Sequence, residues 1–189
     1  MKTSAGLLVI IAVLGILGTA CAEPAPSPRL APDSFFIKTG LAKDTAAFSL
    51  GVGWDQSDWL WSSLPDSVSL TFEGEVGHWQ AFHPRHEQVE FIQFGVTPLL
   101  RFPLAASARC TWFVEGGVGF YFIVPRYRTH EKRFSTSFNF QDLIGLGLRC
   151  GEEHRHEVAF YISHFSNAGI KEPNPGENFL QLRYLWHFD

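Results

Sequence analysis

Apolar and polar side chains alternate along one stretch of this chain after another, and this period of two constrains the fold more than any other feature. The clearest stretch runs from residue 68 to residue 76. Successive side chains of a strand point to opposite faces, so the pattern predicts a strand that lies between an apolar and a polar environment. Its apolar face is Val68, Leu70, Phe72, Gly74 and Val76, and its polar face is Ser69, Thr71, Glu73 and Glu75.

Runs of this kind recur through the rest of the chain. Eight is the smallest common strand number of bacterial membrane barrels. We therefore expect an all-β fold, an eight-stranded antiparallel transmembrane β-barrel over residues 34–189. Pro98 cannot donate to a ladder, and Asp142 interrupts an apolar face, so we expect a bulge near each. The eight runs span residues 34–41, 46–55, 68–76, 90–102, 112–124, 135–149, 158–166 and 180–188.

Residues 1–22 have the three parts of a secretory signal peptide. Lys2 provides the positive charge, residues 7–17 form an apolar segment of 11 residues, and Ala20-Cys21-Ala22 provides a cleavage site. The apolar segment is too short for a comfortable transmembrane helix. The alternative is that Cys21 becomes a lipidated N-terminus. Residues 23–33 contain four prolines and are expected to form an extended leader.

The composition narrows the environment in which such a barrel folds. Aromatic residues make up 15% of the chain and charged residues only 18%, below the usual quarter. No apolar run of membrane-helix length follows the signal. An exported chain of this kind fits a membrane barrel, because only helices and closed barrels satisfy their backbone in lipid. Loss of Lys2 with the signal leaves 14 basic and 19 acidic residues, a net charge of −5, which indicates no nucleic-acid partner.

A membrane barrel carries its apolar face outward and its polar face inward. Glu73 and Glu75 are therefore expected inside the barrel, where Arg101 and Arg149 are candidate partners. We expect short periplasmic turns and longer outer loops to join the strands. The predicted turns are 62–65, 105–108 and 151–154, and the predicted outer loops are 82–88, 126–133 and 169–176.

Two cysteines remain once the signal is removed. In the expected register Cys110 opens the fifth strand, just before its run, and Cys150 closes the sixth, just after its run, so neighbouring antiparallel strands bring both to the periplasmic rim. An exported protein permits either a disulfide or two free thiols at these positions.

A polar constellation interrupts the apolar face at the end of the seventh run. His164 and Ser166 are two residues apart, so on a strand they project from the same face. The imidazole can take the proton of the serine hydroxyl, which is a weak nucleophile until a base activates it. A third group must orient the base, and Glu177 can fold back across the intervening turn to do so. Strict alternation in the eighth run places Glu177 on the opposite face, unless the chain bulges at Gly176.

The string from residue 164 to residue 178, HFSNAGIKEPNPGEN, resembles the motif of the lipid A 3-O-deacylases, which are outer-membrane enzymes of Gram-negative bacteria. The resemblance implies that His164 is the base, Ser166 the nucleophile and Glu177 the orienting acid, with Glu172 as the alternative acid. It also implies an oxyanion hole near Asn167 and the backbone around Gly169, and it requires no cofactor. The matching residues are His164, Ser166, Asn167, Gly169, Lys171, Pro173, Asn174, Glu177, Phe179, Leu182, Arg183 and Tyr184.

By this resemblance the chain is an esterase in the outer membrane of a Gram-negative cell. It would remove the 3-O-linked 3-hydroxyacyl chain from lipid A of lipopolysaccharide, among outer-membrane lipids. Basic residues of the outer loops would then contact lipopolysaccharide phosphates through bidentate hydrogen bonds, or would simply be solvated. These residues are Arg126, Arg128, Lys132, Arg133 and Lys171.

Two other functions remain open at this point. One is a non-catalytic membrane barrel with a structural or adhesion role, and the other is a soluble lipid-binding barrel whose apolar face points inward. His154 and His156, beside Glu152 and Glu153, have the composition of a metal site. Because they fall in a predicted turn, we expect a solvated polar cap there and no bound metal.

Overall fold

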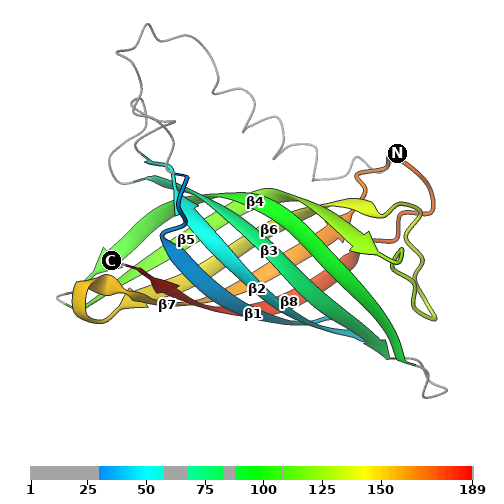
Figure 1. The fold of residues 1–189 in the computed structure, drawn as a ribbon, viewed down its shortest axis with the longest axis horizontal. Coiled ribbons are helices and arrows are strands. Elements are labelled where there is room, and N and C mark those ends of the chain that lie inside the picture. Colours follow the sequence, from blue (N-terminus) through cyan, green and yellow to red (C-terminus); the bar gives the residue numbers. More distant parts are fainter. Residues whose placement is uncertain (1–29, 58–67, 83–87, 108, 189) are drawn as a thin grey trace, which may run out of the picture.

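The computed structural model describes residues 30–57, 68–82, 88–107 and 109–188, and within them the chain forms one closed antiparallel barrel of eight strands. Each strand pairs with the next, and β8 closes the cylinder against β1 (Figure 1). The predicted barrel is therefore confirmed. The strands are β1 (Ser34–Leu41), β2 (Thr45–Asp55), β3 (Ser69–Phe82), β4 (Gln88–Ala106), β5 (Cys110–Val124), β6 (Phe138–Cys150), β7 (His156–Ser166) and β8 (Glu177–His187).

The two expected bulges are both absent from the described ladders. The β4–β5 register is the same before and after Pro98, and it shifts only between Pro103 and Ala105. Asp142 pairs in continuous register with Val118 on one side and with His164 on the other. Asp142 therefore interrupts the apolar face without bending the strand.

The alternation of the sequence becomes the inside and the outside of the barrel. Large apolar side chains cover the outer wall, where Val76 is 54% exposed, Ile144 61% and Phe160 65%. Polar and charged side chains lie buried in the interior. This is the reverse of a soluble lipid-binding barrel, so the inward-apolar alternative is wrong. Leu70 has outward parity but is buried, and the backbone at Leu70 hydrogen-bonds Gln56 and Ser57, which follow β2.

A network of buried ion pairs lies in the interior of the barrel. The Arg183 guanidinium contacts Glu73, Glu115 and Glu157 from the centre of the network. Arg101 adds a second cation that binds Glu115 at 2.7 Å and Glu157 at 2.6 Å.

Glu73 and Glu75 lie inside the barrel as expected, but the partners proposed for them were wrong. Glu73 binds Arg183 and Glu75 binds Lys38, whereas Arg101 and Arg149 pair with other carboxylates. The reason is that the closed barrel brings side chains of distant strands together across its interior.

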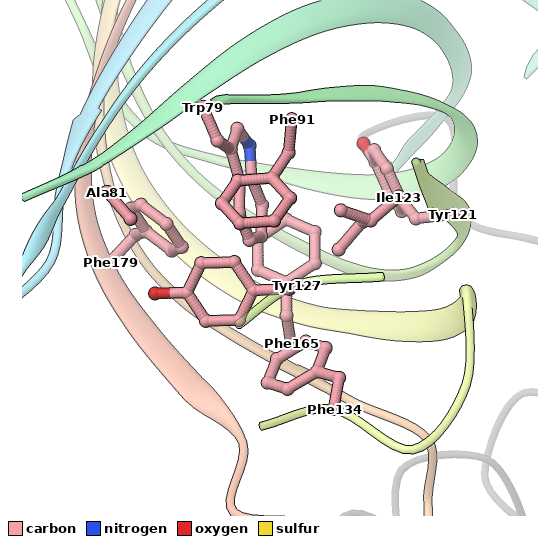
Figure 2. Close-up of a cluster of buried hydrophobic side chains, with 9 residues drawn as sticks. All are labelled: Trp79, Ala81, Phe91, Tyr121, Ile123, Tyr127, Phe134, Phe165 and Phe179. Atoms are coloured by element: carbon pink, nitrogen blue, oxygen red, sulfur yellow. The ribbon is translucent and has the colours of Figure 1, made fainter. Parts of the chain in front are cut away.

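A cluster of mostly aromatic side chains packs inside the barrel (Figure 2). Trp79 packs edge to face against Phe165 at 4.9 Å between ring centroids and against Tyr127 at 5.3 Å. Tyr127 and Phe134 come from the loop between β5 and β6, which therefore enters the barrel mouth. The cluster is Trp79, Ala81, Phe91, Tyr121, Ile123, Tyr127, Phe134, Phe165 and Phe179.

The turns and loops separate to the two ends of the barrel. The β4–β5 and β6–β7 turns lie at one end, and Cys110 and Cys150 pair across β5 and β6 there as a disulfide, which settles the alternative of free thiols. The loops 125–137 and 167–176 lie at the opposite end (Figure 1). The signal peptide, Cys21, the predicted turn 62–65 and most of the predicted loop 82–88 lie outside the described residues.

We predict that replacing Val76 with arginine destabilises the barrel. Val76 lies mid-strand on the outer wall, and an arginine near the bilayer midplane costs about 2–4 kcal/mol. Ile170→Arg is the control, because Ile170 is also exposed but lies in a loop beyond the strands. Urea unfolding in lipid vesicles measures both, and equal losses of stability would contradict a lipid-facing outer wall.

We also predict that Arg183→Leu destabilises the barrel by about 3–5 kcal/mol, because buried carboxylates lose their central cation. Lys43→Met removes an exposed pair with Glu131 and should change the unfolding midpoint little. The same urea titration compares the two variants. An unchanged midpoint for Arg183→Leu would show that the interior network does not stabilise the fold.

Candidate active site

The predicted base and nucleophile lie together on the outer wall near the end of β7. His164 and Ser166 are both half-buried and have the parity of the exposed Phe160 and Ile162. Phe165, between them, points inward and is fully buried against Trp79 and Phe179. The aromatic cluster therefore holds the strand from inside while the two polar groups face outward.

The imidazole of His164 is oriented by Asn178. Its Nδ1 lies 2.6 Å from Asn178 Oδ1, and an amide oxygen only accepts, so Nδ1 carries the hydrogen. The other nitrogen, Nε2, is then the basic one. Gly176 packs against this edge of the ring, and a Cβ added at Gly176 would stand 2.9 Å from Nε2. No hydrogen bond joins His164 to Ser166 in the described chain.

Glu177 does not take the position expected of the orienting acid. It lies inside the barrel, 2% exposed, where its carboxylate accepts hydrogen bonds from Tyr127 at 2.8 Å and Lys132 at 2.7 Å. A hydrogen bond of about 2.6–3.2 Å to His164, which an orienting acid would need, is therefore not formed. The physical reason is register, because β8 begins without a bulge and pairs Glu177 with inward Phe165 and Asn178 with outward His164.

The acid considered as the alternative does not contact His164 either. Glu172 lies in the loop between β7 and β8 and accepts a hydrogen bond from the Asn174 amide at 2.9 Å. Its carboxylate therefore stabilises the loop and forms no hydrogen bond with the imidazole in the described chain.

The expected oxyanion-hole residues use their polar groups to hold the 167–176 loop in place. Asn167 is buried, and its Nδ2 donates to Ser135 and to the carbonyl of Lys171. The Gly169 amide donates to Asn167 Oδ1 at 3.0 Å. These bonds fold the loop, and both predicted donors are already engaged.

The backbone donor that does reach the serine belongs to Ala168. Its amide lies 3.4 Å from Ser166 Oγ, and its φ of 52° is in the left-handed region that non-glycine residues rarely adopt. The hydrogen bonds of Asn167 maintain this strained turn and so keep the Ala168 amide close to the hydroxyl.

Asp142 is the neighbour that sequence reasoning missed. It is the cross-strand partner of His164 on β6, half-buried on the same outer wall. The only sequence signal for Asp142 was that it interrupts an apolar run. The sequence could not show that His164 lies opposite Asp142, because that depends on strand register. The register therefore places a second ionisable group beside the predicted base.

An apolar hollow of about 660 Å³ adjoins the site on the outer wall, lined by residues of β5, β6, β7, β8 and β1. Ile162 and Leu180 line it, and each is two residues along its strand from His164 or Asn178. The site therefore opens beside a surface that suits an aliphatic chain.

The cluster considered for metal binding makes other contacts. His156 Nδ1 is 2.8 Å from the Tyr184 hydroxyl, and Glu153 pairs with Arg155. Across the part of the chain that the structure describes, no three His, Cys, Asp or Glu residues are grouped to hold a metal ion. The same residues include no helix long and apolar enough to cross a membrane.

Comparison with known proteins identifies the family of this chain. The family model for lipid A 3-O-deacylase (PagL) matches residues 45–187, which is well over half of the chain. This chain belongs to the PagL family. The matched region contains β2 to β8 and every residue of the site.

Individual PagL proteins agree with the family match. The lipid A deacylase PagL of Bordetella bronchiseptica is 40% identical over 77 residues, which are 41% of this chain and 42% of that protein, so this match spans less than half of its length. The Pseudomonas aeruginosa PagL is 25% identical over 140 residues, 72% of this chain and 75% of that protein. The crystal structure of the outer membrane enzyme PagL superposes with a TM-score of 0.64 and 23% identity, over 82% of this chain and 99% of that one, and it shows the shared fold.

We predict that Gly176→Ala lowers deacylase activity about 100-fold, because a new methyl group displaces the ring of His164, the predicted base, and small misplacements of a reacting group are costly. Gly151→Ala is the matched control. Gly151 also has a positive φ and also packs on a histidine ring, that of His156, but it lies in the β6–β7 turn at the other end of the barrel. Initial rates of fatty-acid release compare the two, and equal effects would show that only backbone strain is being measured.

Proposed function

We propose that this chain is an outer-membrane esterase that removes the ester-linked 3-hydroxyacyl chain at position 3 of lipid A. One observation carries the proposal: in a member of the PagL family, His164 and Ser166 sit side by side on the lipid-facing wall, next to an apolar hollow. A nucleophile in that position meets a lipid ester at the membrane edge without extracting the lipid from the bilayer.

The chemistry uses His164 and Ser166 in two stages. His164 Nε2 takes the hydroxyl proton as Ser166 Oγ forms a bond to the acyl carbonyl carbon. The bond between that carbon and the sugar oxygen then breaks, and His164 returns the proton to the leaving oxygen. Water, activated by the same imidazole, releases the hydroxy fatty acid from Ser166. Asn178 holds Nδ1 protonated throughout, so that Nε2 is available as the base.

The negative charge on the carbonyl oxygen requires donors in the 167–169 segment. Preorganised amides aimed at such an oxygen typically contribute a hundredfold or more in rate. Ala168 supplies an amide near Ser166, and Asn167 together with Gly169 maintains the turn that presents it. Asn167 thus acts in the oxyanion hole by shaping it.

Glu177 supports the site from inside the barrel. Its bonds to Tyr127 and Lys132 tie the first residue of β8 to the loop that enters the barrel mouth. Asn178 is the next residue, so this anchor sets the position of the amide that orients His164. Glu177→Ala should therefore leave weak but measurable activity.

Two arginines at the barrel mouth suit the phosphates of lipid A. Arg128 and Arg133 face each other across an isolated β-bridge, and both are exposed. Like charges directly opposite each other are unfavourable unless an anion lies between them. Arginine is suited to that role because it binds phosphate through two parallel hydrogen bonds. Lys132 is instead engaged by Glu177.

We predict that wild-type protein expressed in a Gram-negative host with unmodified lipid A removes one 3-hydroxyacyl chain, and that Ser166→Ala and His164→Ala abolish this. Loss of the nucleophile or base of a serine triad costs on the order of a millionfold in turnover. Mass spectrometry of extracted lipid A measures the product. Both variants should still show the heat-modifiable gel mobility of a folded barrel.

Deacylation by either folded variant would contradict the proposed roles. Unmodified lipid A from cells with folded wild-type protein in the outer membrane would favour the non-catalytic barrel. Fractionation of the same cells tests location, since the mature chain should sediment with the outer membrane and be absent from the periplasmic extract.

A further inference from the structure

We propose that Asp142 is a positioning residue of this active site, which supplies the negative charge that stabilises His164 when the imidazole takes up the serine proton. The inference rests on the proposed esterase function and deepens it. It assigns the electrostatic role of a triad acid to a residue on a neighbouring strand, outside the motif that contains His164, Ser166 and Glu177.

Register brings Asp142 beside the base. Asp142 on β6 and His164 on β7 are direct cross-strand partners, and side chains so paired share a face with Cβ atoms about 4.5–5.5 Å apart. No hydrogen bond or ion pair to Asp142 is formed by the residues that the structure describes. The carboxylate is thus near the imidazole, beyond direct contact, and not neutralised by another group.

The surroundings make this charge unusual. On the outward face of β6, the residues nearest to Asp142 along the strand are Phe140 and Ile144. On the same face of β7, the residues nearest to His164 are Ile162 and Ser166. On β8 the corresponding residues are Asn178 and Leu180. Asp142 is therefore the only other ionisable group in this part of the described outer wall. An ionisable residue on a lipid-facing surface costs stability and usually marks a function.

Two groups near the imidazole, Asn178 and Asp142, share the work of a triad acid. Asn178 fixes the tautomer by accepting from Nδ1, but a neutral amide does little for the positive charge that develops on the ring. Glu177 carries a charge, but it lies inside the barrel and is paired with Lys132. Asp142 supplies what both lack, a carboxylate on the outer face close enough to act through its field.

The experiment measures initial rates of 3-hydroxy fatty acid release from purified lipid A by the mature protein in detergent micelles. Asp142→Asn keeps the shape and removes the charge. We expect kcat to fall about 10- to 100-fold, as a lost charge interaction across about 5 Å at a protein surface implies, with KM unchanged. Asp142→Glu should restore most of the rate. Glu131→Gln is the charge-matched control, since Glu131 is exposed and binds Lys43, and it should behave as wild type.

Stability separates this role from a structural one. Asp142→Asn and Asp142→Val should unfold at the same or higher urea concentration than wild type, because each removes a charge from the lipid-facing wall. Lower activity with equal or greater stability supports the proposal. A kcat of Asp142→Asn within twofold of wild type would overturn it, as would a loss of activity that follows a loss of stability or a rise in KM alone. Wild type and Ser166→Ala are measured in parallel. Release of fatty acid by wild type but not by Ser166→Ala supports the esterase proposal, whatever the result for the Asp142 variants.

Discussion

Closure of the sheet is the constraint on which the rest of this molecule depends. A strand in lipid must hydrogen-bond every backbone N–H and C=O group within the protein, because no water is present to bond the groups of an open edge. The pairing of β8 with β1 removes both edges. Closure also forces one face of every strand inward, so the polar half of the alternating sequence must be satisfied inside a narrow cylinder. The ion network around Arg183 pairs the charged inward side chains, and the aromatic cluster around Trp79 fills interior space that carries no charge.

The same constraint explains how this barrel can hold the proposed active site on its outer wall. A polar pair facing lipid has few neighbours to fix it, and the order must come from the other face of the strand. Phe165 provides it, because its ring packs into the buried cluster between the two outward groups. Glu177 has the same effect on β8, because its hydrogen bonds inside the barrel fix the residue that precedes Asn178. Interior packing thus positions the outward side chains to which we assign the chemistry.

Membership in the PagL family fits a barrel whose interior gives order and whose outer wall carries the residues of the site. The match covers most of the barrel as well as the motif, and the site residues are contributed by β6, β7, β8 and the loop between the last two strands. The motif alone contains a base, a nucleophile and an acid in one short string. In the structure an amide of β8 bonds the imidazole and a carboxylate of β6 lies opposite it, and we propose that these two groups share the role of the acid.

The sequence by itself determined the strand count, the inward and outward faces, and the projection of His164 and Ser166 from the same face. All three follow from a period of two, which is a local property of each strand. Alternation even indicated that Glu177 would face inward, against the role that the motif suggested. Only the tertiary structure decided the partners of Glu73 and Glu75, the hydrogen bond between His164 and Asn178 and the position of Asp142. These depend on which strands are neighbours, on their register and on contacts across a closed interior, and no single stretch of sequence contains that information.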